Sequence, residues 1–114
     1  MSITIKRIYE PVGAKDGYRV LVDRLWPRGI SKEEAHVDTW LKEVAPSTEL
    51  RKWFHNGEGS FAEFKKKYLA ELKQNPALQD LRSLYKEHKK LTLLYAAKDE
   101  EQNHAQILAE LLGS

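Results

Sequence analysis

The stretch that most constrains the fold of this chain is residues 18–29, YRVLVDRLWPRG. Its Val20-Leu21-Val22 core has no alternation of polar and apolar residues, which predicts a strand buried on both faces, as in a parallel sheet between helices. The charged residues Asp23 and Arg24 follow where this apolar run stops. Because open α/β sheets bind ligands outside the carboxyl ends of their strands, this corner is the first candidate for a functional site.

Apolar patterning predicts the other strands. Residues 3–9 alternate apolar and polar side chains, and residues 91–96 form a second strongly apolar run. Residues 37–41 also alternate, which fits a third strand almost as well as a short helix. Residues 10–17 contain one proline and two glycines and are expected to form a loop.

Capping signals predict where the helices begin. Ser31 and Ser60 are each followed three residues later by a glutamate, which matches the capping box. Helices are expected to start at Ser31, Pro46, Ser60 and Asn75-Pro76, and a last helix is expected over residues 100–112. Strands that alternate with helices indicate one α/β domain over residues 1–114, a compact sandwich with a small, mostly parallel sheet of three or four strands flanked by helices.

Composition excludes several classes of function. With 19 Lys and Arg against 17 Asp and Glu, the formal net charge is only +2, so affinity for nucleic acid would need local clustering of charge. The chain has no cysteine, which excludes disulfides, thiolate metal sites and a cysteine nucleophile. Its four histidines are scattered, so no structural zinc site is expected, although two carboxylates at the predicted crevice could hold a magnesium ion weakly. No apolar run is long enough for a signal peptide or a membrane span, which predicts a cytoplasmic protein without membrane contact.

Two of the predicted strands are each followed directly by a group of charged and polar side chains. If the two strands run parallel, both groups lie at one edge of the sheet and line one crevice. The glycine-rich motifs of dinucleotide and Walker-type sites are missing, so the sequence assigns no cofactor to that crevice. The candidate residues are Asp23, Arg24, Trp26 and Arg28 after the first strand, and Tyr95, Lys98, Asp99, Asn103 and His104 after the second.

His104 is the candidate for acid–base chemistry. It lies three, four and seven residues before Ile107, Leu108 and Leu111, so it continues the buried stripe of the last helix and points inward. There it acts as a general acid or base oriented by Asp23 or Asp99, or it is a core histidine bonded to a backbone carbonyl. Asp99 is equally well placed to cap the last helix.

The cations of this edge are candidates for holding an anion. Arg24 and Arg28 suit bidentate contacts with a phosphate or carboxylate, and each could instead pair with an acid such as Asp23 or Glu34. Lys98 either contacts the ligand or neutralises the charge of a neighbouring acidic side chain. The aromatic residues Trp26 and Tyr95 and the amide of Asn103 complete the ligand-binding set, although tryptophan more often packs in a core or at its rim.

Three segments, VLVDRLWPRG, VAPSTELRKWF and LLYAAKDEEQNHA, resemble the bacterial family catalogued as domain of unknown function 488, in its short single-domain branch. The resemblance covers nearly the whole chain and implies a Rossmann-like arrangement with residues 37–41 as an inner strand. Longer relatives carry Asp-Val-Arg, Cys-Ala-Glu and Cys-His-Arg at the corresponding positions. This chain has Asp23-Arg24, then Tyr95-Ala96-Ala97 and Asn103-His104-Ala105, which shifts the implied site onto its arginines, Lys98 and His104.

The leading hypothesis is an anion-binding crevice that acts on a nucleotide or another phosphorylated or carboxylated metabolite. One alternative is a nucleic-acid-binding or transcription-regulatory module that uses Arg24, Trp26, Arg28 and Lys32. Another is a protein-interaction module in which an exposed Trp26 or Trp40 docks on a partner. Turnover and simple binding both remain open at this stage, and the oligomeric state is unassigned.

Overall fold

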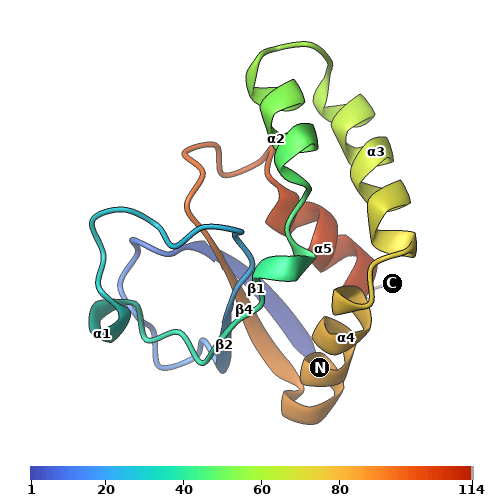
Figure 1. Cartoon of the computed structure of the whole chain (residues 1–114). Helices are drawn as coiled ribbons and strands as arrows, with labels where there is room; N and C mark the ends of the chain where they lie inside the picture. Colours follow the sequence, from blue (N-terminus) through green and yellow to red (C-terminus); the bar gives the residue numbers. More distant parts are fainter. Residues whose placement is uncertain (114) are drawn as a thin grey trace.

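The computed structural model describes residues 1–113, and within them it contains a four-stranded sheet and helices. Figure 1 shows how these elements are arranged. None of the helices in this part of the chain is long and apolar enough to cross a membrane. In chain order the elements are β1 (Ser2–Arg7), β2 (Tyr18–Leu21), α1 (Lys32–Ala35), β3 (Thr39–Trp40), the 3₁₀ helix η1 (Lys42–Val44), α2 (Thr48–His55), α3 (Phe61–Lys73), α4 (Ala77–His88), β4 (Lys90–Tyr95) and α5 (His104–Gly113).

The sheet has the strand order β1-β4-β2-β3, and every pair of neighbours is parallel. This confirms the predicted α/β class with a small parallel sheet. It also corrects the position implied for residues 37–41, because β3 is an edge strand and not an inner one. Only two residues of β3 pair with β2, since the chain turns into η1 at Lys42.

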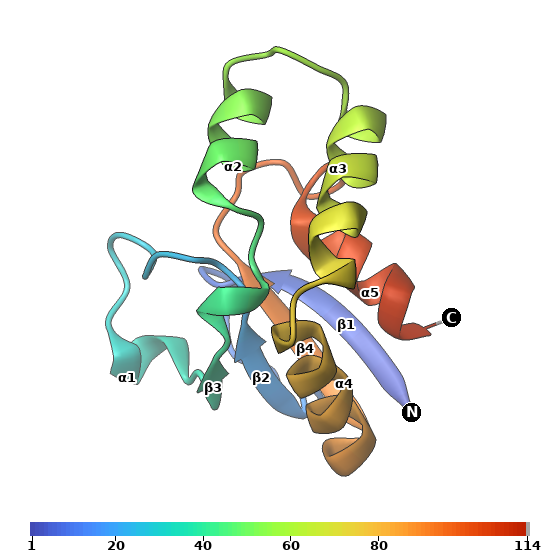
Figure 2. The same ribbon diagram turned by 45° about the vertical axis from the view of Figure 1, so that its right-hand side comes forward.

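Both faces of the central strands β2 and β4 are buried, as the continuous apolar pattern predicts. Val20 and Leu93 face the larger core, which packs against α2 to α5, whereas Leu21 and Leu94 face a smaller core with Ile8. Figures 1 and 2 show the longer helices on one side of the sheet and the single turn of α1 on the other. The second face is therefore covered mainly by loop segments and not by helices.

The helix starts follow their capping signals except at the C-terminal helix. Both capping boxes are present, at Ser31 for α1 and at Ser60 for α3. The predicted start of the last helix near residue 100 is wrong, because α5 begins at His104. Asp99 accepts hydrogen bonds from the N–H groups of the two residues that follow Glu100, and this local turn competes with helical bonding. Asn103 then caps α5, since its Oδ1 accepts from the N–H of Gln106 at 3.0 Å.

A buried ionic cluster fixes the loop between β1 and β2, and the sequence analysis did not predict it. The Asp16 carboxylate accepts from the backbone N–H of Gly13 at 3.0 Å, from Lys6 Nζ at 3.1 Å and from Arg19 Nη1. Arg19 also donates to the carbonyl of Ala35, the last residue of α1, at 2.9 Å. The cluster thereby ties the loop, β2 and α1 together on the less covered face of the sheet.

The hairpin of α2 and α3 rises beyond the C-terminal ends of the strands (Figure 2). Its base is fixed by hydrogen bonds of two residues, Ser47 and Tyr68. Ser47 caps α2 through Leu50 N–H at 3.1 Å, and its hydroxyl donates to Glu71 of α3 at 2.6 Å. Tyr68 of α3 is fully buried and donates to the carbonyl of Val44 at 2.6 Å. This placement puts α2 directly above the strand ends where charged residues were predicted to gather.

Candidate functional site

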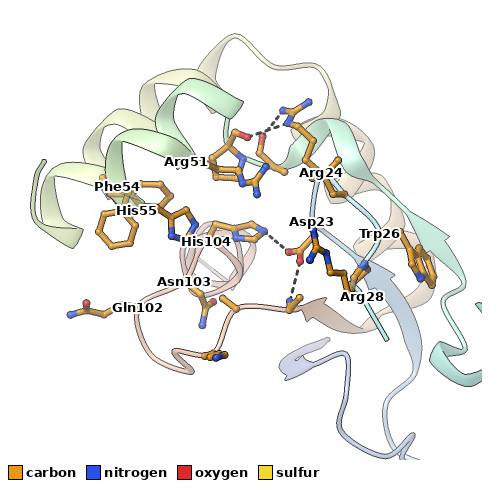
Figure 3. Close-up of a pocket in the computed structure, with 18 residues that line it drawn as sticks. Asp23, Arg24, Trp26, Arg28, Arg51, Phe54, His55, Gln102, Asn103 and His104 are labelled. Carbon is orange, nitrogen blue, oxygen red and sulfur yellow. Dashed lines mark hydrogen bonds and ion pairs between the residues drawn. The ribbon is translucent and has the colours of Figure 1, made fainter. Parts of the chain in front are cut away.

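A cavity of about 400 Å³ lies where the C-terminal ends of β2 and β4 meet the α2–α3 hairpin (Figure 3). Its position is the one expected for ligand binding by a parallel α/β sheet. Three parts of the chain form its walls. They are residues 23–28 after β2, residues 96–98 and 102–104 after β4, and Ala45, Pro46, Arg51, Phe54, His55 and Phe64 from the hairpin side.

The two strand ends meet at Asp23 and His104, as the parallel arrangement predicts. One carboxylate oxygen of Asp23 accepts from the backbone N–H of Ala96 at 3.0 Å and so links the ends of β2 and β4. The other lies 3.3 Å from His104 Nε2 and is buried without a well-formed hydrogen bond among the described residues. Both side chains are mostly buried, with 17% of Asp23 and 14% of His104 exposed.

The contacts of His104 determine which ring nitrogen carries a hydrogen. Nε2 lies 2.9 Å from the carbonyl oxygen of Val22, and the Asp23 carboxylate is its other polar neighbour. A carbonyl oxygen and a carboxylate oxygen only accept, so Nε2 carries the hydrogen. Within residues 1–113, Nδ1 has no protein partner and is the nitrogen that can accept a proton or bond a ligand. The geometry combines both interpretations of His104, a histidine held by a backbone carbonyl and one oriented by Asp23.

Four permanent cations and one carboxylate line the cavity, which gives a net charge of +3 with both histidines neutral. Arg24 is anchored by donating from Nη2 to the carbonyl of Ala45 at 3.0 Å and from Nε to that of Pro46 at 3.3 Å. The predicted alternative, pairing with Asp23 or Glu34, is not observed, because Glu34 belongs to the capping box of α1. The cations are Arg24, Arg28, Arg51 and Lys98, and the carboxylate is Asp23.

None of the four cations has a carboxylate partner in the described chain, and three of them also make no side-chain hydrogen bond to it. Arg28 and Lys98 are exposed at the rim, and Arg51 is half-buried on α2. None of their side-chain nitrogens makes a hydrogen bond or an ion pair with residues 1–113. Unpaired cations that converge on one cavity repel one another, so the local electrostatic potential of the cavity is positive.

Sequence reasoning missed the contribution of the hairpin. Arg51 and His55 lie one turn apart on α2, with Phe54 beside them, and all three face the cavity (Figure 3). Phe64 of α3 lies behind Phe54, with ring centroids 4.7 Å apart. The available signal was the i, i+4 spacing of two basic residues next to the apolar stripe of α2. The spacing indicates a shared face but not which part of the protein that face meets.

Two candidates from the sequence do not line the cavity. Tyr95 is 2% exposed and packs in the larger core, and burial raises the pKa of its phenol. Asp99 is exposed, and hydrogen bonds from the N–H groups of Gln102 and Glu101 hold its pKa below the usual 3.8. Its carboxylate is therefore engaged in a local turn, and Asp23 is the acid that faces His104.

Two other candidates line the cavity with their polar groups already in use. Asn103 donates from Nδ2 to the Asp99 carbonyl at 2.9 Å while its Oδ1 caps α5. Trp26 donates from Nε1 to the carbonyl of Ile30 at 2.8 Å and packs edge-on against Trp40, with ring centroids 5.5 Å apart. These residues shape the cavity walls, and the two tryptophans, both half-buried, do not form the exposed anchor that the protein-interaction hypothesis requires.

Two other kinds of site were considered in the described residues, a metal site and a nucleic-acid-binding surface. No group of three or more histidine or carboxylate side chains within residues 1–113 is arranged to hold a metal ion. Lys32, part of the predicted nucleic-acid set, lies at a separate hollow of about 170 Å³ with Val37 and the two tryptophans. Arg24 and Arg28 line the larger cavity, and Trp26 lines both hollows.

Comparison with known proteins identifies the family. The family model described as the inactive DUF488-N3 subclade matches residues 2–114. The uncharacterized protein YeaO of Escherichia coli (strain K12) is 53% identical over 116 residues, which cover 100% of this chain and 99% of that protein. The uncharacterized protein Rv3073c of Mycobacterium tuberculosis (strain ATCC 25618 / H37Rv) is 43% identical over 110 residues, which cover 96% of this chain and 92% of that protein. No solved structure matches the chain. The chain therefore belongs to the DUF488 family, in the branch described as the inactive DUF488-N3 subclade.

Proposed function

We propose that this protein binds a small organic anion, phosphorylated or carboxylated, in the cavity at the C-terminal ends of β2 and β4. The observation that carries the proposal is the convergence of four cations and one carboxylate on a cavity of about 400 Å³. Cavities of this size enclose a whole small-molecule ligand. The net positive charge selects for an anion, and partly apolar walls reduce the screening of that charge by water.

Arg51 is the strongest single contact in the proposed site. Its guanidinium is half-buried and has no partner among the described residues, so all of its donors are available to a ligand. Arg24 contributes a guanidinium fixed by two backbone carbonyls, which leaves its third nitrogen for the ligand. A guanidinium held in place loses little freedom on binding, and it can contact a phosphate or carboxylate in two places.

His104 supports the proposal as the group that meets an oxygen of the ligand at the cavity floor. Because Nε2 already donates to Val22 and faces Asp23, only Nδ1 is available for a ligand. With its hydrogen on Nε2, the ring presents Nδ1 as an acceptor for a hydroxyl group of the ligand.

Binding without turnover fits the family description, which calls this subclade inactive. The resemblance to longer relatives places Tyr95-Ala96-Ala97 and Asn103-His104-Ala105 where those proteins carry cysteines and a glutamate. Tyr95 is buried in the core, and Ala96 and Ala97 have no group that could serve as a nucleophile or a base. The proposed role is therefore that of a receptor for a small anion.

Titration calorimetry on the full chain tests the proposal. The ligands are ribose 5-phosphate, adenosine 5′-monophosphate and citrate, each titrated at two salt concentrations. We expect at least one of them to bind, and we expect Arg51→Gln to weaken that binding about tenfold or more, because hydrogen bonds to charged groups contribute about 1.5–3 kcal/mol. The matched control is Arg82→Gln, which changes an exposed arginine of α4 outside the cavity and should leave affinity unchanged.

Two results would overturn the proposal. One is that none of the three anions binds at millimolar concentration. The other is that Arg51→Gln binds as tightly as the unmodified protein while both unfold at the same temperature. A short DNA duplex added as a fourth titrant tests the nucleic-acid alternative, and the proposal expects it to bind more weakly than the small anions and with no greater loss in Arg51→Gln than in Arg82→Gln.

A further inference from the structure

The two ends of the cavity differ in chemistry (Figure 3). The end toward the strand termini carries Arg24, Arg28 and the Asp23 carboxylate. The end toward the hairpin carries the aromatic rings of Phe54 and His55, and the Arg51 guanidinium of the same helix lies one turn before His55. A ligand that fills both ends therefore combines an anionic group with a planar or apolar part.

The aromatic end is supported by packing behind it. The Phe54 ring lies 4.7 Å from that of Phe64 and 5.9 Å from that of Phe61, measured between centroids. Phe64 is buried, and its ring lies 6.0 Å from that of the fully buried Tyr68. Phe54 itself is half-buried and lines the cavity. A ring held from behind by other rings presents a fixed apolar surface, on which a planar ligand ring can stack.

Volume narrows the class of anion. The lining carries a net charge of +3 with neutral histidines, which is enough to neutralise a dianion. A phosphate monoester carries a charge of about −1.5 to −2 at neutral pH. The volume of about 400 Å³ exceeds the need of a free phosphate or a simple aromatic carboxylate and suits a ligand of phosphate, sugar and ring.

From these observations we infer that the ligand is a nucleoside monophosphate whose phosphate lies among Arg24, Arg28 and Arg51 and whose base stacks against Phe54 and His55. The inference rests on the proposed anion-binding function and names its ligand class. Every nucleobase has an apolar face, so stacking on Phe54 gives affinity without strong choice among bases.

Calorimetry with three ligands and three variants of the full chain tests the inference. The ligands are adenosine 5′-monophosphate, ribose 5-phosphate, which has the same phosphate and sugar without the base, and benzoate. Phe54→Leu keeps apolar volume and removes the aromatic ring, whereas Phe54→Tyr keeps the ring. Phe61→Leu is the matched control, because Phe61 contacts Phe54 but does not line the cavity.

We expect adenosine 5′-monophosphate to bind roughly tenfold more tightly than ribose 5-phosphate, as stacking on an aromatic side chain provides. Phe54→Leu should reduce that ratio to about twofold while leaving ribose 5-phosphate affinity unchanged. Phe54→Tyr and Phe61→Leu should retain the ratio. Uridine 5′-monophosphate should bind within a few-fold of the adenosine nucleotide.

The outcomes separate this inference from the function on which it rests. Equal affinity for adenosine 5′-monophosphate and ribose 5-phosphate would overturn the stacking inference and leave the anion site intact. Benzoate binding as tightly as the nucleotide, with the same loss in Phe54→Leu, would overturn the assignment to nucleotides. Failure of adenosine 5′-monophosphate and ribose 5-phosphate to bind would overturn this inference, and failure of citrate as well would overturn the proposed function.

Discussion

Replacing Asp16 by asparagine removes the negative charge that the buried Arg19 and the half-buried Lys6 share at the loop before β2. The Asp16 carboxylate accepts from Gly13 N–H at 3.0 Å, from Lys6 Nζ at 3.1 Å and from Arg19 Nη1. The Arg19 side chain is only 4% exposed, so water cannot replace the lost partner. An asparagine has the same shape but keeps a single acceptor oxygen, and it points an NH₂ group toward a cation.

The expected loss of stability follows from this geometry. The hydrogen bonds from Gly13, Lys6 and Arg19 all lose the negative charge of their acceptor, and bonds to charged groups contribute about 1.5–3 kcal/mol each. Removing one partner of a buried ion pair destabilises proteins by about 3–5 kcal/mol. We therefore expect Asp16→Asn to lower the free energy of unfolding by about 3 kcal/mol or more. That is a large share of the roughly 5–15 kcal/mol typical of a whole domain.

The pKa of Asp16 gives the same prediction a pH dependence. Burial raises this pKa, but the hydrogen bonds from Gly13, Lys6 and Arg19 lower it by more, so it lies below the usual 3.8. A carboxyl whose pKa falls on folding adds stability that is complete above its unfolded pKa and is lost as pH falls through its folded pKa. The difference in the free energy of unfolding between the unmodified protein and Asp16→Asn should be constant near pH 7. It should become smaller below about pH 4.

Urea unfolding followed by circular dichroism at pH values between 7 and 2.5 measures the loss in the free energy of unfolding and its dependence on pH. The control is Glu87→Gln, because Glu87 is an exposed carboxylate of α4 without an ion-pair partner in the described chain. We expect this control to change the free energy of unfolding by less than about 0.5 kcal/mol. An Asp16→Asn variant within 1 kcal/mol of the unmodified protein at pH 7, or a difference that does not narrow in acid, would refute the reasoning.

Two further substitutions probe the hairpin and the strand ends. Gly59→Ala should destabilise the protein by about 1–3 kcal/mol, because the added methyl group would overlap the Trp53 ring. The substitution should also shift the fluorescence of Trp53. An unchanged urea unfolding curve would contradict this prediction. Asp23→Asn should destabilise it by about 1–3 kcal/mol, since either orientation of the amide points an NH₂ group at an N–H of Ala96 or of His104. Urea unfolding measures this loss, and a ¹⁵N spectrum of the histidines in the unmodified protein should show His104 with hydrogen on Nε2.

Local patterns predicted most of the fold. The continuous apolar residues of β2 and β4 indicated strands buried on both faces, and the structure has them as adjacent parallel strands. The same pattern placed Asp23 and His104 at one sheet edge, where they lie 3.3 Å apart. Capping boxes at Ser31 and Ser60 gave the starts of α1 and α3, because a cap uses atoms only three residues apart.

The errors arose where several local signals compete. Asp99, Asn103 and the intervening acidic residues all offer caps or turns, and the sequence does not rank them. The structure uses the Asp99 carboxylate for a turn and Asn103 for the cap, so α5 starts at His104 and not near residue 100. Asp99 consequently faces solvent and lies outside the cavity that it was expected to line.

The sequence by itself determined the parallel sheet, its buried strands and the meeting of Asp23 with His104, because these depend on residue periodicity and on the common direction of parallel strands. Only the tertiary structure decided the other half of the cavity. Arg51, Phe54 and His55 reach it because the α2–α3 hairpin packs above the strand ends, held by the buried Tyr68 hydroxyl on the Val44 carbonyl. The orientation of a helix over a sheet depends on side-chain packing between segments far apart in the chain, which no local pattern encodes.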